Sequence, residues 1–425
     1  VRDRGPGIHA VLERELTPLG QIYLRVIVHL LRCATTLRYI SVMTQRPIRP
    51  IPLTLGGLPD VNDILGRDQS ASDVEKLLLG GQSVLLTGDR RTGKTCFSRV
   101  VEHGLRRRGH PVVRVSAERA SFGDFVDALS REIEKEFQLT SELQRWEPTV
   151  KAGPFEARRR APIVGLDQLL TKISERGTDK RVVVIIDEVP ILARAMEQEK
   201  PGAGAAVLDT LRRVRQEHGS GLSMLLLGSI GFHHIAKSSP GSLNDITKEH
   251  VGPLVEADGV YLARCLMAGD SINAIDPNAF AVAVHKAAEG IPYYIHHLVR
   301  DTRNHIGVHG FAATSLPAQL VDEALHHVDD PWNLRHYRDR VPEYYPDREE
   351  LAYSVLDIFA GATGALGVND VMRLLAATPH AGETSRRGLI DLIELLEQDH
   401  YLRREGKANS FRSEIVRRAW MATWR

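Results

Sequence analysis

The chain has 425 residues, too many for one ordinary domain, so we expect two or three domains, each with its own core. Hydrophobic residues make up 43% of the sequence and charged residues 26%, and 55 basic against 54 acidic residues leave a net charge of +1. These values are typical of a soluble globular protein and exclude a global positive field, so any nucleic-acid surface must be local. The three cysteines, Cys33, Cys96 and Cys265, fit neither a disulfide framework nor a zinc cluster, which favours a reducing cytoplasm.

Residues 1–62 are expected to form an N-terminal extension before the first domain. Residues 21–40 are rich in Leu, Ile and Val, but basic residues interrupt them, so they do not predict a membrane span, and we expect no membrane partner. Because the chain opens with Val, one interpretation is that residues 1–42 are an upstream extension and the working protein begins near Met43. An amphipathic docking helix is the alternative. The proline-rich stretch 44–62 predicts an extended segment.

Four short apolar runs alternate with helical patterns between residues 63 and 256, the range of the first predicted domain. The runs are residues 83–87, 112–116, 182–186 and 224–228, and the helical patterns include residues 94–108, 121–137 and 166–177. Runs without polar alternation are typical of strands that helices cover on both faces. The pattern therefore predicts an α/β fold with a parallel sheet.

The stretch 138–162 lacks this periodicity and predicts an inserted loop. It contains Gly153-Pro154 and a basic run, Arg158 to Arg160. Such a run can contact a phosphate backbone, but most are simply solvated, so both interpretations stay open.

Three further segments complete the chain. Residues 257–309 are helical in pattern throughout and predict a small helical domain, and residues 310–347, rich in His, Pro and Tyr, predict a connector. Residues 348–425 show three amphipathic patterns followed by two short strands around a Gly-containing turn; the three patterns are residues 348–360, 368–377 and 385–399. Three helices followed by a hairpin predict a winged helix.

The first chemical motif follows the apolar run 83–87 and opens a helical pattern; it consists of Gly88, Asp89, Arg90, Arg91, Thr92, Gly93, Lys94 and Thr95. This is the sequence and the context of a P-loop, in which backbone N–H groups and a helix N-terminus hold phosphate oxygens. A chance match arises at about the one per cent level in a chain of this length. We therefore predict ATP and Mg²⁺ as cofactors. Lys94 would reach the β- and γ-phosphates, Thr95 would hold the metal, and Cys96 would complete this set of ATP-binding residues.

The apolar run 182–186 ends in two carboxylates, Asp187 and Glu188. Acidic residues at strand ends are common as simple caps, but downstream of a P-loop they predict the second half of the site. Asp187 is expected to bind Mg²⁺, and Glu188 to orient and deprotonate the attacking water. The pair favours hydrolysis over phosphoryl transfer to an acceptor.

The fourth apolar run ends at Gly228-Ser229. In this position Ser229 is a candidate to hydrogen-bond the attacking water or the γ-phosphate. The alternative is that these two residues form a turn.

Two short elements complete the set of motifs: Gly66-Arg67-Asp68 before the first strand, and Gly290-Ile291-Pro292 in the helical segment. With the P-loop, the Asp-Glu pair and the terminal winged helix, they make residues 64–425 resemble the ATPase family found predominantly in archaea. That family is a STAND-like branch of the AAA+ ATPases. The resemblance implies a P-loop core, a helical lid and a winged helix, and ATP-dependent homo-oligomerisation.

The resemblance also implies that Gly66, Arg67 and Pro292 flank the adenine and ribose of ATP. Asp68 stands where relatives often carry Glu. The sensor arginine expected in the lid motif is absent, although Arg300 and Arg303 follow it. No arginine finger is identifiable, with Lys237 and Lys248 the nearest candidates in the sequence. Slow turnover and switch-like behaviour are therefore expected.

The winged helix is a candidate contact for double-stranded DNA. Its third helix begins with basic residues but continues with Asp391, Glu394 and Glu397, which oppose a polyanion. The candidate nucleic-acid contacts are Arg386, Arg387, Arg403, Arg404, Lys407 and Arg412. A winged helix that binds a protein partner is the alternative, and Trp420 and Trp424 are expected in the core.

Together these patterns predict a cytoplasmic ATPase that acts as a nucleotide-dependent switch, linked to DNA through its winged helix in replication, mobile-element or defence functions. The alternative is a signalling ATPase whose winged helix binds a protein and not DNA.

Overall fold

The computed structural model describes residues 46–118, 121–138, 157–176, 180–228, 241–380, 382 and 385–422, with backbone alone at 157–164 and 308–309. The chain divides at Pro50 into two units, and the second, Ile51–Arg425, holds every element described below. In the described part of the chain, no helix combines the length and the apolar character needed to cross a membrane.

A five-stranded parallel sheet forms the core of the first domain, as predicted. Its strands are β1 (Val84–Thr87), β2 (Val112–Ser116), β3 (Val182–Asp187), β4 (Leu222–Leu227) and β5 (Thr247–His250), in the spatial order β2-β3-β4-β1-β5. The four apolar runs supply the first four strands. β5 was not predicted, because it is an edge strand of sequence Thr-Lys-Glu-His whose side chains are alternately half-buried and exposed.

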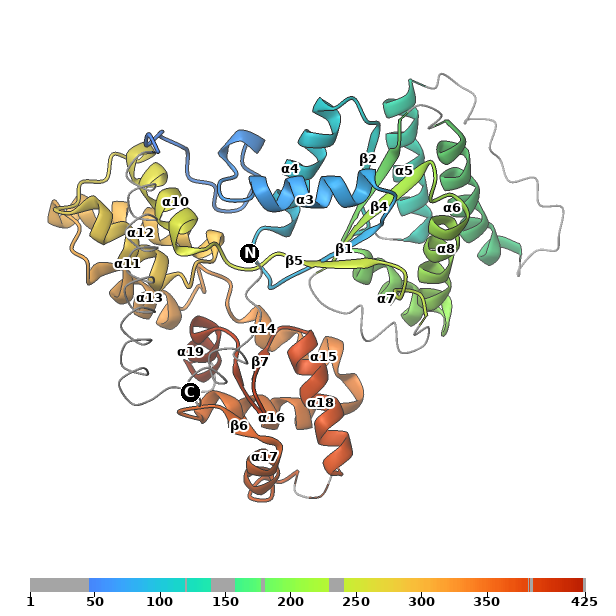
Figure 1. Ribbon diagram of the computed structural model, residues 1–425. Helices are drawn as coiled ribbons and strands as arrows, with labels where there is room; N and C mark the ends of the chain where they lie inside the picture. Colours follow the sequence, from blue (N-terminus) through green and yellow to red (C-terminus); the bar gives the residue numbers. More distant parts are fainter. Residues whose placement is uncertain are drawn as a thin grey trace, which may run out of the picture. The chain divides into compact units, whose positions relative to one another are not determined.

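Helices cover both faces of this sheet (Figure 1). One face carries α3 (Asp68–Leu79) and α4 (Lys94–Arg107), and the other carries α5 (Phe122–Phe137), α6 (Ala157–Arg176), α7 (Val189–Glu199) and α8 (Ala203–Glu217). Successive residues of β3 join opposite clusters: Val183 and Ile185 pack with α3 and α4, and Val184 and Ile186 with α5 to α8. Burial on both faces explains why the strands show no polar alternation.

The predicted loop at 138–162 is wrong at its end. Helix α6 begins at Ala157, so the basic run Arg158 to Arg160 lies in its first turn. That turn carries no apolar residue larger than alanine, so its sequence gives no helical period. Residues 139–156, the rest of the predicted loop, lie outside the described residues.

Four helices follow the sheet and pack on one another, and together they are called the lid below. They are α10 (Glu256–Gly269), α11 (Pro277–Ala287), α12 (Pro292–His309) and α13 (Leu316–His326). Phe280 of α11 and Tyr294 of α12 are fully buried in its core. Helix α13 packs on α11 and α12, although its residues belong to the stretch expected to be a connector.

A short segment ahead of the first domain also packs on the lid. The N–H of Ile51 donates to the carbonyl of Cys265 in α10 at 3.2 Å, and the N–H of Thr54 donates to Nδ1 of His296 in α12 at 3.1 Å. The chain then passes through a 3-10 turn, η1 (Val61–Asp63), and enters the sheet domain. The lid follows the sheet domain in the sequence, but it also packs on this segment, which precedes that domain.

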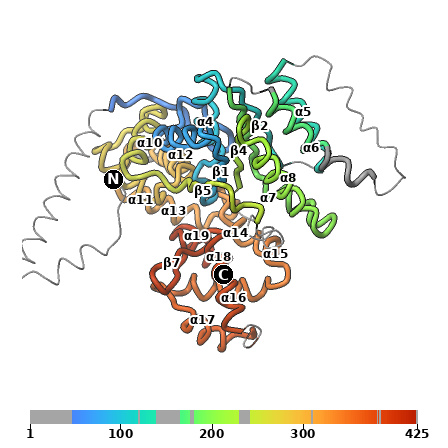
Figure 2. The backbone as a smooth tube through the Cα atoms, turned by 45° about the vertical axis from the view of Figure 1, so that its right-hand side comes forward, coloured from blue at the N-terminus to red at the C-terminus, as the bar shows by residue number. Residues whose placement is uncertain are grey.

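The C-terminal segment, orange to red in Figure 2, has the element order expected of a winged helix. Two short helices, α14 (His336–Asp339) and α15 (Val341–Tyr344), and the turn η2 (Pro346–Arg348) lead into it. Its elements are α16 (Glu349–Gly361), β6 (Leu366–Gly367), α17 (Val368–Leu375), α18 (Arg386–Gln398), β7 (Leu402–Glu405), β8 (Ala408–Phe411) and α19 (Glu414–Ala422). The three strands form an antiparallel sheet in the order β6-β8-β7.

Trp420 lies in the core of this segment, as expected. It is 2% exposed, and its Nε1 donates to the carboxylate of Asp357 at 2.6 Å. Trp424 lies outside the described residues.

Candidate nucleotide site

The P-loop connects the end of β1 to the start of α4 with a backbone that requires glycine. Gly88 has φ 153°, and a Cβ there would lie 2.3 Å from the carbonyl oxygen of Val251. Gly93 has φ 86° and occupies the N-cap of α4, where no side chain of the described residues caps the helix. The first N–H groups of α4 therefore lack the usual side-chain acceptor, an arrangement that suits a phosphate.

Lys94 is buried in this loop, with 8% of its surface exposed. Its Nζ donates to the carbonyls of Gly88 and Asp89 at 2.9 and 2.8 Å. Burial lowers the pKa of Lys94 to about 8, against the opposing negative charge of Glu188. A bound phosphate would supply the anion that this buried ammonium lacks.

The two carboxylates stand at the end of β3, and β4 alone separates β3 from the P-loop strand β1. Asp187 is buried. Glu188 is the N-cap of α7 and has φ 56°, a left-handed conformation that a non-glycine residue holds only when its surroundings impose it. Burial raises the pKa of Glu188, with Lys94 opposing this. A raised pKa makes a carboxylate a better proton acceptor.

Arg114, on β2, links the two halves of the site. Its Nη2 donates to Oγ of Ser98 at 2.7 Å, and Ser98 in turn donates to the carbonyl of Thr95 at 2.9 Å. Its Nη1 lies 3.9 Å from Oδ2 of Asp187. The sequence signal for this residue was a single arginine in the otherwise apolar run Val-Val-Arg-Val.

The predicted Mg²⁺ ligands suit that ion. A hydroxyl from Thr95 and a carboxylate from Asp187 are hard oxygen donors, the kind Mg²⁺ prefers. The Arg114 to Ser98 linkage holds the backbone of Thr95 and the side chain of Asp187 in one network.

The structure brings the Gly66-Arg67 and Gly290-Pro292 elements to the same short linker between β5 and α10. This linker, residues 251–255, is called the hinge below. Nη2 of Arg67 donates to the carbonyls of Thr92 and Gly252, at 2.9 and 2.8 Å. The N–H of Leu254 donates to the carbonyl of Gly290 at 2.8 Å, two residues before Pro292 starts α12. Gly66 has φ 73°, and a Cβ there would lie 2.6 Å from Cβ of Asp258.

The side chains of two P-loop residues point away from the loop toward C-terminal elements. The carboxylate of Asp89 accepts a hydrogen bond from Nε of Arg412 at 2.8 Å and lies 3.1 Å from Nδ1 of His400. Arg91 donates to the carbonyl of Trp332, and its guanidinium lies 4.1 Å from the centre of the Tyr293 ring. Sequence patterns gave no indication of His400 or Trp332.

Most of the predicted nucleic-acid contacts have protein partners. Nη2 of Arg412 also lies 3.0 Å from Nε2 of His250. Burial lowers the pKa of His250. Four more arginines of the C-terminal segment lie near acidic or amide groups: Arg387 near Asp391 at 3.2 Å, Arg403 near Glu405 at 2.9 Å, Arg404 near Glu397 at 3.1 Å, and Arg386 near Asn369 at 3.5 Å. Lys407 is exposed at the turn between β7 and β8.

The remaining candidates are placed as follows. Ser229 and Lys237 lie outside the described residues. Arg300 pairs with Asp301 at 2.6 Å and Arg303 with Asp270 at 3.4 Å, so both lid arginines already have acidic partners. Burial raises the pKa of the Cys96 thiol, which follows the P-loop on α4.

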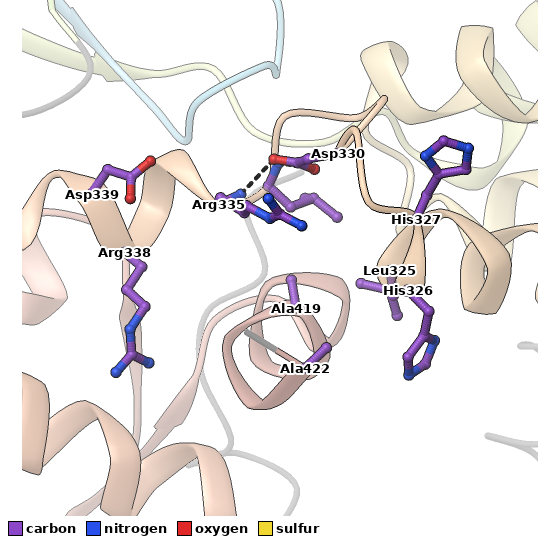
Figure 3. A pocket seen from close by; sticks show the side chains of 10 residues that line it. Leu325, His326, His327, Asp330, Arg335, Arg338, Asp339, Ala419 and Ala422 are labelled. Carbon is purple, nitrogen blue, oxygen red and sulfur yellow. Dashed lines mark hydrogen bonds between the residues drawn. The ribbon is translucent and has the colours of Figure 1, made fainter. Parts of the chain in front are cut away.

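A separate hollow of about 470 Å³ lies between α13, the segment before α14, and α19 (Figure 3). Its lining includes His326, His327, Arg335 and Ala419, and the N–H of Arg335 donates to the carboxylate of Asp330 at 2.8 Å. None of its lining residues belongs to the P-loop or to the Asp187-Glu188 pair.

The fold has solved counterparts. A Walker-type ATPase of Pyrococcus abyssi is similar over 88% of this chain and 99% of its own, with a TM-score of 0.59 and 16% identity. The ORC2 protein of Aeropyrum pernix, in ADPNP-ADP complexes, is similar over 88% of this chain and 98% of its own, with a TM-score of 0.51 and 13% identity. No protein-family model and no curated protein matches the sequence. The chain therefore has the P-loop fold of archaeal Walker-type ATPases, as the sequence resemblance implied.

Proposed function

We propose that this chain binds and hydrolyses ATP and acts as a switch, in which the nucleotide at the P-loop determines whether the β7–β8 hairpin stays on that loop. The observation that carries the proposal is the double role of Asp89. Its carbonyl accepts a hydrogen bond from Lys94, while its carboxylate accepts one from Arg412, the residue that directly follows the hairpin.

Phosphate binding would act on both of these contacts. A phosphate would draw the Lys94 ammonium away from the carbonyls of Gly88 and Asp89, because an anion is a stronger partner than a neutral carbonyl. The freed loop backbone would then move the Asp89 carboxylate relative to Arg412. That ion pair is part-buried, with Asp89 15% and Arg412 29% exposed, so a change in its geometry alters its energy more than at a fully solvated pair.

Hydrolysis would use groups already in place. Thr95 and Asp187 would hold Mg²⁺, which would neutralise charge on the phosphates. Glu188, with its raised pKa, would accept the proton of the attacking water. The ADPNP and ADP bound to the Aeropyrum pernix protein support nucleotide binding in this fold.

Two measurements test the switch. Wild-type protein should hydrolyse ATP, and Lys94→Ala should not. Hydrogen exchange of the β7–β8 hairpin should differ between ADP and a non-hydrolysable ATP analogue. Arg412→Ala should abolish that difference, and Arg403→Ala, on β7 but paired with Glu405, should preserve it. Identical exchange in both nucleotides would overturn the switch.

DNA binding by the released hairpin is a second candidate. Arg412 directly follows β8, the strand after the exposed Lys407, and its guanidinium would become available on leaving Asp89. The acidic partners of Arg387, Arg403 and Arg404 instead favour a protein partner. Turnover measured with and without duplex DNA at low salt separates the two, since DNA-dependent stimulation requires the first. Self-association on ATP belongs to the same proposal, and light scattering with and without nucleotide tests it.

A further inference from the structure

The segment between α13 and α16 makes hydrogen bonds to the P-loop at one point and to α7 at another. Near its start, Arg91 of the P-loop donates to the carbonyl of Trp332. Near its end, Nη1 of Arg194 donates to the Glu343 carboxylate at 3.0 Å. Arg194 lies on α7, the helix whose N-cap is Glu188. The residues between Trp332 and Glu343 are thus held close to both halves of the site.

Arg340 lies between these two anchors, at the junction of α14 and α15, and is only 9% exposed. Its guanidinium lies 5.3 Å from the centre of the Tyr344 ring, and Arg194 lies 4.5 Å from the same ring. The guanidinium shares a side-chain hydrogen bond with Tyr344, but its Nη1 is buried and has no hydrogen-bond partner among the residues that the structure describes. A buried guanidinium without a counter-ion is costly unless an anion completes its surroundings.

The charge of Arg340 acts on the groups of the nucleotide site. Burial lowers the pKa of Lys94 to about 8, and Arg340 acts in the same direction. Burial raises the pKa of Glu188, whereas the positive charges of Lys94 and Arg340 lower it. Burial also lowers the pKa of Arg90, and the positive charge of Arg340 adds to this effect. Arg340 is therefore close enough for its charge to act on Arg90, Lys94 and Glu188.

The cations at this end outnumber the anions that can neutralise them. Arg90, Lys94 and Arg340 face Glu188 and Asp187, while the carboxylate of Asp89 is engaged by Arg412. Burial lowers the pKa of His336, next to this cluster, to about 3, and the charges of Arg90 and Arg340 contribute. A multiply charged anion would relieve this excess positive charge.

We propose that Arg340 binds the terminal phosphate of ATP and makes the site prefer ATP to ADP. This assignment rests on the proposed nucleotide binding at the P-loop. The terminal phosphate is the part of the ligand expected at Lys94 and Glu188, whereas Arg67 and Gly252 lie at the hinge end. A guanidinium offers two parallel N–H donors to phosphate oxygens, so it distinguishes a further phosphate well.

The position of Arg340 gives its contact a second consequence. It stands one short helix and one turn before α16, the first helix of the C-terminal segment. A terminal phosphate would therefore hold this end of the segment as long as ATP is intact. This link is separate from the Asp89 to Arg412 contact.

The test compares nucleotide affinities of purified full-length protein by titration calorimetry with a non-hydrolysable ATP analogue and with ADP. Arg340→Gln should weaken analogue binding about 10- to 100-fold and ADP binding less than about threefold, since only the charged hydrogen bond to the third phosphate is lost. Arg340→Lys should give an intermediate loss. Arg335→Gln, an exposed arginine that lines the hollow of Figure 3, is the matched control and should change neither affinity.

Each outcome decides the assignment. Unchanged analogue affinity in Arg340→Gln, or an equal loss for analogue and ADP, would overturn it while leaving nucleotide binding intact. Failure of wild-type protein to bind either nucleotide would overturn the proposed function itself. If the variants unfold, hydrogen exchange of residues 336–344 in wild-type protein decides: the analogue should slow it more than ADP does, and equal protection would refute the assignment.

Discussion

The carboxylate of Glu289 accepts a hydrogen bond from the backbone N–H of Ile415 at 2.7 Å. Glu289 directly follows the lid helix α11 and its cap, and Ile415 is in the first turn of α19. Burial raises the pKa of Glu289, while hydrogen bonds from Ile415, Ser413 and Glu414 lower it. A lid residue therefore acts as an N-terminal cap for the last described helix.

Removing this cap should destabilise the protein. We expect Glu289→Ala to lower the free energy of unfolding by about 1–2 kcal/mol, the usual effect of losing a helix cap. Urea denaturation measures the change, and Glu323→Ala, an exposed position on α13, is the control. Hydrogen exchange should also accelerate in α19, and unchanged exchange there would contradict the capping role.

Glu188→Gln should separate binding from hydrolysis. The amide cannot accept the proton of the attacking water, so turnover should fall by about 10²- to 10⁴-fold. ATP affinity should stay near that of wild-type protein, because Lys94 and the P-loop backbone are unchanged. Glu199→Gln, exposed at the other end of α7, controls for the loss of a charge. Loss of ATP binding in Glu188→Gln would argue against its role as a base.

The buried Lys94 should make the stability of the nucleotide-free protein depend on pH. Its pKa is about 8 in the folded chain because of burial, against 10.5 ordinarily. Between these two pKa values the unfolded chain binds more protons than the folded chain, so the free energy of unfolding should rise with pH. The cost of the buried ammonium, up to about 3 kcal/mol, is present in full below pH 8.

Lys94→Met isolates this contribution. From pH 7.5 to pH 10, wild-type protein should gain stability relative to Lys94→Met in denaturant titrations. A constant difference between the two proteins would show that Lys94 does not titrate in this range. Saturating ATP should reduce the effect, because phosphate favours the charged form of Lys94.

Arg67→Ala should weaken both the fold and nucleotide binding. The guanidinium donates to Thr92 in the P-loop and to Gly252 in the hinge, so its removal leaves two carbonyls without this partner. We expect about a tenfold loss of ATP affinity, typical of one hydrogen bond to a charged group, and a lower melting temperature. Fluorescence titration and thermal unfolding measure these changes, with Lys76→Ala on the exposed face of α3 as control. A lower melting temperature with unchanged affinity would assign Arg67 to stability alone.

The sequence was sufficient to predict features that depend on neighbours along the chain. The buried strands and the P-loop are short patterns in which each residue's environment follows from the few residues around it. The edge strand β5 and the helix α13 escaped prediction because their surroundings come from distant segments. Thr-Lys-Glu-His becomes a strand by pairing with β1, more than 150 residues earlier in the chain.

The couplings around the site were harder still to predict. Asp89 and Arg412 are 323 positions apart in the sequence, and each had a plausible local role, one in the P-loop and one on a basic hairpin. Arg340 carried no motif at all. Only the three-dimensional path of the chain places these side chains beside the loop.

The packing of Ile51 and Thr54 on the lid would limit any movement of the lid relative to the sheet domain. Residues 55–66 lead from these contacts into the sheet domain, and residues 251–255 lead back from β5 to α10. Two connecting segments therefore join the lid to the sheet domain. Two connections at separate points define a rotation axis, so closure over a ligand would be a rotation about that axis. Because Glu289 is hydrogen-bonded to the first turn of α19, the same rotation would also set the direction in which α19 moves.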